Sequence, residues 1–166
     1  MYFCKPERNI RQVKLLLFLS AGITALIFLV STLVPSYASL IQLTGFLALV
    51  IAIWLNVRFS LTEYEYAVGN GDFAVIRITG NRRQTVCNIA LETAMDVITK
   101  RDYDHLPSAE RAIIKYSLNQ NMFAESYVFL CDFNGKKTMV EFEPNIEFVS
   151  ILKNEIMLAK QNSKNQ

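Results

Sequence analysis

The residues with the clearest potential for chemistry are a group of carboxylates and the only histidine, near position 100. Asp102, Asp104 and His105 lie close together in the chain, and Glu92 or Asp96 could join them around a metal ion. A metal site needs ligands that converge from fixed elements, and this run lacks the second ligand pair of the recognisable metal motifs. Because such residues prefer the surface, we expect a solvated turn and no metal.

The three cysteines, Cys4, Cys87 and Cys131, form no CxxC pair and have no histidine cluster nearby. The sequence therefore predicts neither a disulfide framework nor a zinc site. Cys87 and Cys131 lie in apolar, strand-like runs and are expected to be small buried residues, whereas Cys4 is a candidate for acylation. No G-x-S-x-G, Walker or HExxH motif occurs. We expect no catalytic residue, no cofactor and no enzymatic activity.

A cluster of like charge, Arg77, Arg82 and Arg83, lies around the Gly80-Asn81 turn. If this part of the chain lies against a membrane, each arginine could contribute about 1 kcal/mol to the binding of anionic lipid. The simpler interpretation is solvated surface charge. A sensor of anionic lipid headgroups is therefore the alternative function.

A long apolar region precedes these residues in the sequence and determines on which side of a membrane they lie. No Asp, Glu, Lys, Arg or His occurs between Lys14 and Arg58, and the run is interrupted only by Val34-Pro35-Ser36-Tyr37. Residues 15–34 and 38–57 each match the roughly 20 residues with which a helix crosses a bilayer. The run is also too long for a signal peptide and lacks a small-x-small cleavage site. The sequence predicts a transmembrane hairpin, 15–57, after a basic segment, 1–14.

The flanking charges predict the orientation of this hairpin. Lys5, Arg8, Arg11 and Lys14 precede the first span and Arg58 follows the second, while the connecting turn has no charge. Since cations stay on the cytoplasmic side, we expect a multi-pass protein of the cell (inner) membrane with both termini in the cytoplasm. The cysteines would then lie in a reducing compartment.

The spans contain no ionisable residue, which argues against a transport pathway. Small residues recur at helical spacing and would let the two helices pack closely, and Gln42 could contact a second protomer. The predicted packing residues are Ala21, Ala25, Gln42, Gly45, Ala48 and Ala52.

Residues 58–160 have the composition of one small, mainly β domain. From Arg58 to the end of the chain the charges nearly balance, with 13 Lys and Arg against 14 Asp and Glu, which argues against a nucleic-acid partner. Alternating apolar residues and the turns Gly69-Asn70-Gly71-Asp72, Gly80-Asn81-Arg82-Arg83 and Asn134-Gly135 predict hairpins. The expected strands are 59–68, 73–79, 85–89, 94–99, 127–133 and 137–143, with a helical turn as an alternative at 90–95.

Two other segments depart from the β pattern. Residues 100–125 resemble an insertion, with a polar loop followed by a short amphipathic helix that Ser108 could cap and that ends near Leu118. After Pro144 the apolar period becomes helical, from Phe148 to Ala159, and a polar, disordered tail is expected at 161–166.

Antiparallel strands followed by one C-terminal helix are the order of a pleckstrin-homology-like split barrel. The chain resembles a family of small bacterial two-span proteins, common in Gram-positive anaerobes and known only as a domain of unknown function. The matching segments are Leu61–Tyr66, Asn70-Gly71-Asp72, Gly80–Arg83 and Phe142–Asn145. This resemblance implies a pleckstrin-homology-like membrane protein, with no activity attached.

The fold class expected is thus a membrane α-helical hairpin plus a mainly β, α+β cytoplasmic domain, a split barrel closed by its last helix. We expect a membrane-tethered interaction or scaffold module. Its partners would be the lipid bilayer and an unidentified protein, with a second copy of the chain as one alternative. The sequence gives no sign of a small-molecule substrate.

Overall fold

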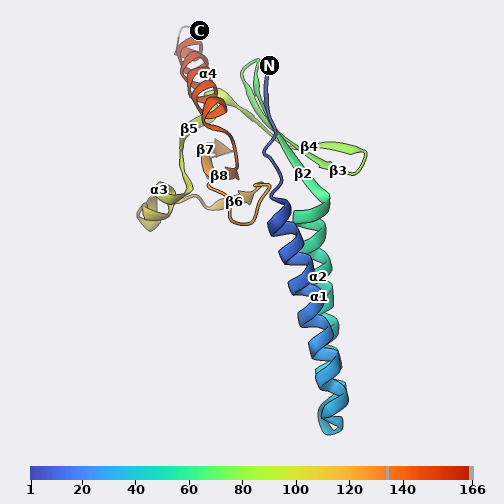
Figure 1. The fold of residues 1–166 in the computed structure, drawn as a ribbon. Helices are drawn as coiled ribbons and strands as arrows, with labels where there is room; N and C mark the ends of the chain where they lie inside the picture. Colours follow the sequence, from blue (N-terminus) through green and yellow to red (C-terminus); the bar gives the residue numbers. More distant parts are fainter. Residues whose placement is uncertain (134, 165–166) are drawn as a thin grey trace. The chain divides into compact units, whose positions relative to one another are not determined.

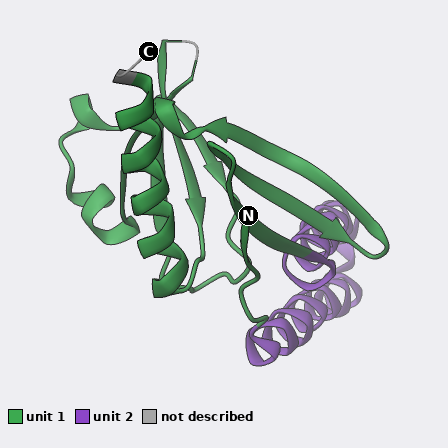
Figure 2. Cartoon of the chain, turned by 90° about the horizontal axis from the view of Figure 1, so that it is seen from above, with its two compact units in different colours: residues 1–8, 63–166 green, residues 9–62 purple. Residues whose placement is uncertain are grey.

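The chain forms two compact units, which Figure 2 distinguishes by colour. The computed structural model describes residues 1–133 and 135–164. Unit 1 consists of Met1–Arg8 and Glu63–Gln166, and unit 2 consists of Asn9–Thr62. The chain therefore leaves unit 1 after Arg8 and returns to it at Glu63.

Unit 2 is a pair of apolar helices, as the sequence predicted. Helix α1 (Ile10–Leu33) and helix α2 (Ala38–Asn56) are joined by a short 3-10 turn, Pro35–Tyr37, and run side by side (Figure 1). The Asn9 side chain caps α1 by accepting hydrogen bonds from the backbone N–H groups of Arg11 and Gln12. The helical region starts before the predicted residue 15 because this cap lies in the polar segment.

The expected start of the first strand at Phe59 is wrong. A π-helical turn, Val57–Leu61, continues from α2, and strand β2 (Thr62–Gly69) begins only after it. The Thr62 hydroxyl donates a hydrogen bond of 3.0 Å to the Val57 carbonyl oxygen, which satisfies a carbonyl at the helix end. The helical hydrogen-bond pattern thus extends into residues with a strand-like composition.

Unit 1 contains two four-stranded sheets and a C-terminal helix. The first sheet has the order β1-β2-β3-β4, and the second has the order β5-β7-β8-β6. The strands besides β2 are β1 (Tyr2–Cys4), β3 (Asp72–Thr79), β4 (Arg82–Ala90), β5 (Ala94–Thr99), β6 (Ile114–Ser117), β7 (Tyr127–Phe133) and β8 (Lys136–Phe142); the helix is α4 (Ile146–Lys164).

The predicted hairpin turns follow from local conformation. Asn70 and Gly71 have positive φ values of 57° and 82°, which the turn between β2 and β3 requires and which Asn and Gly tolerate best.

The start of α4 also follows from a local contact, because the Asn145 side chain, after Pro144, accepts a hydrogen bond from the Phe148 N–H. The mostly antiparallel sheets and the C-terminal helix are confirmed.

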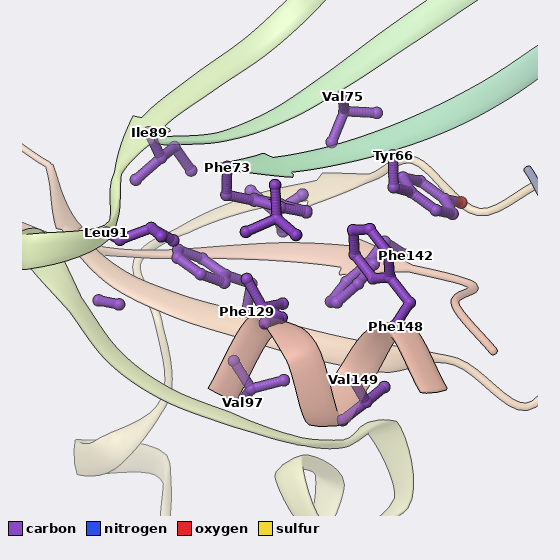
Figure 3. Packing of buried hydrophobic residues seen from close by; sticks show 14 of the residues in the cluster. Tyr66, Phe73, Val75, Ile89, Leu91, Val97, Phe129, Phe142, Phe148 and Val149 are labelled. Atoms are coloured by element: carbon purple, nitrogen blue, oxygen red, sulfur yellow. The ribbon is translucent and has the colours of Figure 1, made fainter. Parts of the chain in front are cut away.

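The core of unit 1 is built from both sheets and α4. Phe73 stacks on Phe129 with ring centroids 4.9 Å apart, and Tyr66 meets Phe142 edge-on at 5.4 Å. Figure 3 shows Phe148 of α4 beside Phe142, and Val149 of the same helix belongs to the same buried cluster. Aromatic contacts of this kind add to the free energy of apolar burial.

The amphipathic helix expected up to Leu118 is wrong. Ile114–Ser117 forms β6, which pairs in parallel with β8 from Ile114 opposite Thr138 to Ser117 opposite Glu141. Ser108 makes no side-chain cap and starts only a 3-10 turn, Ser108–Glu110. Pairing with a strand distant in sequence outweighs the weak helical preference of this segment, and it also makes the second sheet mixed rather than antiparallel.

The structure also tests three smaller predictions from the sequence. The expected polar loop at Lys100–His105 is a short helix, α3, which Thr99 caps. Helix α4 continues through Gln161 to Lys164, so the disordered tail is wrong for those residues. The Leu91–Thr93 segment forms the helical turn that was the alternative to a strand. Asn134 and residues 165–166 lie outside the described residues.

Candidate binding site

The three predicted lipid-binding arginines do not lie on one face. Arg77 of β3 lies opposite Gln84 of β4, and its Nη2 donates a hydrogen bond of 2.9 Å to Gln84 Oε1. Arg83 lies opposite Ile78, one position along, and forms an ion pair with Glu65. Because neighbouring residues of a strand point to opposite faces, Arg83 is separated from Arg77 and Arg82. Its positive charge is also offset by the Glu65 carboxylate.

The residues considered for a metal site make local contacts instead. Asp102 Oδ2 accepts a hydrogen bond of 2.6 Å from the Thr99 hydroxyl, and Lys100 forms an ion pair of 2.5 Å with Asp104. His105 is an exposed residue at the end of α3. Among the described residues, no group of three or more His, Cys, Asp and Glu side chains is arranged to hold a metal ion.

Within unit 2, the predicted packing residues fall into two sets. Gly45 is buried, and a Cβ atom there would lie 3.2 Å from the Ile27 and Phe28 side chains, so α1 and α2 approach closely at this point. Ala48 and Ala52 are half-buried, one and two turns further along α2. The other three, Ala21, Ala25 and Gln42, are exposed.

A polar contact between the helices was not predicted. Asn56 Nδ2 donates hydrogen bonds to Ser20 Oγ at 3.1 Å and to the Ala52 carbonyl oxygen at 2.8 Å. An amide that pairs across a helix contact is a common source of specificity between apolar helices. Ser20 and Asn56 are both visible as polar residues in the apolar sequence, but the sequence does not indicate that they face each other.

Within unit 1, a junction network joins the segment before α1 to the segment after α2. Glu63 forms ion pairs with Lys5 at 2.7 Å and Arg8 at 3.3 Å. The hydrogen bond from Lys5 is the main cause that lowers the pKa of the Glu63 carboxyl, although partial burial acts the other way. Gln120 Oε1 accepts a hydrogen bond from Tyr64 N–H, and Asn121 Nδ2 donates one to the Glu7 carbonyl.

A cavity of about 310 Å³ lies between the inner faces of the two sheets. Its buried wall is formed by Tyr64, Ile89, Cys131 and Val140, which come from four different strands. The position of Ile89 at the edge of the core can be followed in Figure 3. A concave, mainly apolar hollow with a few polar groups is the usual form of a small-molecule site.

The mouth of this cavity combines aromatic and polar side chains. Tyr116 and Phe133 are each 52% exposed although they are large aromatic residues. Arg77 and Asn88 are also exposed and line the same cavity. Among the described lining residues, Arg77 is the only one with a formal charge at neutral pH. The mouth can therefore offer a cation and two aromatic faces.

Two cysteines line the cavity, but neither has the properties of a nucleophile. Burial is the main cause that raises the pKa of both the Cys87 and the Cys131 thiols to about 11. At neutral pH both groups are therefore protonated, and only the thiolate attacks or binds metals strongly. Cys4 is buried in the core as well, and burial raises the pKa of its thiol.

Sequence reasoning did not find this cavity. It predicted that Cys87 and Cys131 are buried, but it did not bring them together with the other lining residues, which come from distant strands. Tyr116 and Phe133 were assigned to a predicted helix and a predicted hairpin, so the sequence did not place these two aromatic residues at one site.

Comparison with known proteins gives one result. Neither the search of curated proteins nor the search of solved structures found a match. A family model described as a bacterial PH-like domain, DUF6106, matches residues 5–159, which cover the apolar helices, strands β2 to β8 and most of α4. The chain therefore belongs to this family of PH-like domains of unknown function.

Proposed function

We propose that the protein is a membrane-anchored, non-catalytic interaction module. Its two apolar helices cross the cell membrane as a hairpin and tether the PH-like unit, a split barrel closed by α4, at the cytoplasmic surface. There the unit binds a protein partner. Contacts through exposed residues of the hairpin such as Gln42, including contacts with a second copy of the chain, belong to the same proposal.

The pairing of β1 with β2 is the observation that carries this proposal. Tyr2 lies opposite Val68 and Cys4 lies opposite Tyr66 in an antiparallel ladder. One of these strands precedes α1 and the other follows α2, so the two ends of the hairpin must lie on the same side of any membrane that it crosses. Two spans, rather than one, satisfy this requirement.

The surface of the helices supports insertion into lipid. In the most apolar stretch of each helix, 0% and 6% of the residues are buried. Phe18 and Leu33, for example, are 72% and 70% exposed. Such a large exposed apolar surface is unfavourable in water and favourable in a bilayer. The basic residues before α1 and Arg58 after α2 favour a cytoplasmic unit 1.

The alternative, a sensor of anionic lipid headgroups, has less support. It would use Arg77, Arg82 and Arg83 together, but Arg83 pairs with Glu65 on the other face of its sheet. Asp72 also places a negative charge at the first hairpin turn, where pleckstrin-homology domains use basic residues. An enzyme is supported least, because the thiols that line the cavity are protonated at neutral pH.

Affinity capture from native membranes tests the interaction role. The full chain and a fragment with residues 9–62 would be used as parallel baits after mild cross-linking. We expect a protein that the full chain recovers and the fragment does not, with recovery lost when unit 1 is destabilised. Identical recoveries by the two baits would contradict the proposal, because the hairpin alone would then make all the contacts.

A further inference from the structure

The cavity between the two sheets has the features of a ligand site that no comparison assigns. Its wall is apolar and deeply buried, with Tyr64 at 3% exposure and Val140 at 0%. Its mouth is open and carries Tyr116 and Phe133, which are half exposed to water. A ligand that entered the cavity would cover these rings and remove apolar surface from water.

The charge of the lining residues restricts the kind of ligand. Arg77 contributes a positive charge at the mouth, and no described lining residue contributes a negative one. Thr138, which is buried at 3% exposure, also lines the cavity and carries a hydroxyl group. An arginine guanidinium recognises a carboxylate or a phosphate through paired hydrogen bonds. The arrangement thus suits an apolar body with one anionic end.

The volume restricts the size of the apolar part. A group the size of a water molecule occupies about 30 Å³, so about 310 Å³ holds roughly ten such groups. This corresponds to a linear acyl chain of about ten carbon atoms and is too small for a complete phospholipid. One acyl chain of a phospholipid could enter while the rest stayed outside.

We propose that this cavity binds an amphipathic acyl anion, with the chain between the sheets and its anionic group on Arg77. The proposal rests on the cavity and does not depend on the interaction role proposed above. Cys87 lines the cavity and is half-buried, and the small thiolate fraction in equilibrium with its protonated thiol reacts slowly with a maleimide, so this reaction can report occupancy. A bound chain would shield the thiol from a small alkylating reagent.

The test measures the rate at which N-ethylmaleimide modifies Cys87 in the full chain, held in phosphatidylcholine nanodiscs, with mass spectrometry of the Cys87 peptide. Decanoate is the probe, and decanol is the uncharged control of the same length. We expect decanoate to slow the reaction in a saturable way. Arg77→Gln should weaken this protection about tenfold, as expected when a hydrogen bond to a charged group is lost. Decanol protection should be the same in parent and variant.

Arg82→Gln is the matched control. Arg82 is also an exposed arginine of the β3–β4 hairpin, but it does not line the cavity, so protection by decanoate should equal that of the parent. Both variants should melt like the parent and show its reaction rate without ligand. These comparisons separate binding at Arg77 from simple partition of the acid into the nanodisc.

A second arm distinguishes a free acid from a membrane lipid. If phosphatidylglycerol nanodiscs protect Cys87 without added decanoate, and Arg77→Gln removes this protection, the acyl anion is part of a lipid. Protection only by decanoate assigns a free acid. Absence of protection in both arms, or equal protection of the parent and Arg77→Gln, would overturn the proposal.

Discussion

Tyr66 is a fully buried residue whose hydroxyl group joins two distant segments of unit 1. The hydroxyl donates a hydrogen bond of 2.9 Å to the Leu118 carbonyl oxygen and accepts one of 3.0 Å from the Glu143 N–H. Burial is the main cause that raises the pKa of this phenol far above its ordinary value of 10.0. The group is therefore neutral at physiological pH and available for both bonds.

We predict that Tyr66→Phe lowers the free energy of unfolding by about 1–3 kcal/mol, because it leaves the partly buried Leu118 carbonyl and Glu143 N–H without their partner. Tyr116→Phe, at an exposed position, should change it by less than about 0.5 kcal/mol. Urea denaturation in detergent, followed by circular dichroism, measures both. Equal stabilities of the two variants would show that the Tyr66 hydroxyl has no structural role.

Glu63 gives the junction network a pH dependence. Since the pKa of Glu63 is lowered in the folded protein, its ion pairs contribute stability above the ordinary value of 4.5 and lose it as the pH falls through the lowered pKa. The side chain is 32% exposed, so we expect Glu63→Gln to cost no more than about 1 kcal/mol at neutral pH. Melting curves of parent and variant should converge well below pH 4.5. A difference that stays constant with pH would contradict this account, and Glu125→Gln, in an exposed loop, serves as the control.

At the scale of elements, β1 is the part that a sequence pattern could not reveal. It has three residues, Tyr2–Cys4, which are too few to show an alternating period. Only its pairing with β2 and the burial of Cys4 identify it as part of the sheet. A fragment that begins at Arg58 would therefore lack an edge strand and a core residue.

We predict that Cys4 in the folded full chain reacts with a maleimide at least about tenfold more slowly than a cysteine placed at position 3. Phe3 is 57% exposed and lies on the opposite face of the same strand, so Phe3→Cys provides the comparison. Mass spectrometry of the labelled N-terminal peptide measures both rates. Similar rates would mean that β1 does not stay paired in solution, and burial would then no longer prevent acylation of Cys4.

The elements that the sequence predicted correctly are those specified by neighbouring residues. The apolar helices, the hairpin around Asn70-Gly71 and helix α4 each have a local period or turn signal. Strand β6 was not predicted because its hydrogen-bond partner, β8, lies about twenty residues further along the chain. Intrinsic preference decides little when such distant pairing is available.

The candidate site was less predictable than the fold. The cavity takes its lining from strands of both sheets, so no single segment contains its pattern. The arginine cluster illustrates the opposite problem, since residues close in sequence were expected to act together. The sequence analysis assigned Arg82 and Arg83 to a turn, but both belong to strand β4, where adjacent residues point to opposite faces.

At the scale of the whole molecule, the discontinuous composition of unit 1 is the feature with the widest consequence. Residues from both sides of the apolar hairpin form one folded unit. This arrangement requires both flanks to share a compartment, and the basic residues of the N-terminal segment favour the cytoplasm. The proposed anchoring, the reduced state of the cysteines and the location of the cavity all depend on this topology.

Site-directed labelling in intact cells tests this topology most directly. Single cysteines would be introduced at Ser36, in the turn between α1 and α2, and at Asn162, near the end of α4, and treated with a membrane-impermeant maleimide. The parent chain measures background reaction of its three native cysteines. We predict that the cysteine at 36 reacts in intact cells, whereas the one at 162 reacts only after the membrane is opened. Reaction at 162 in intact cells, with protection at 36, would contradict the account.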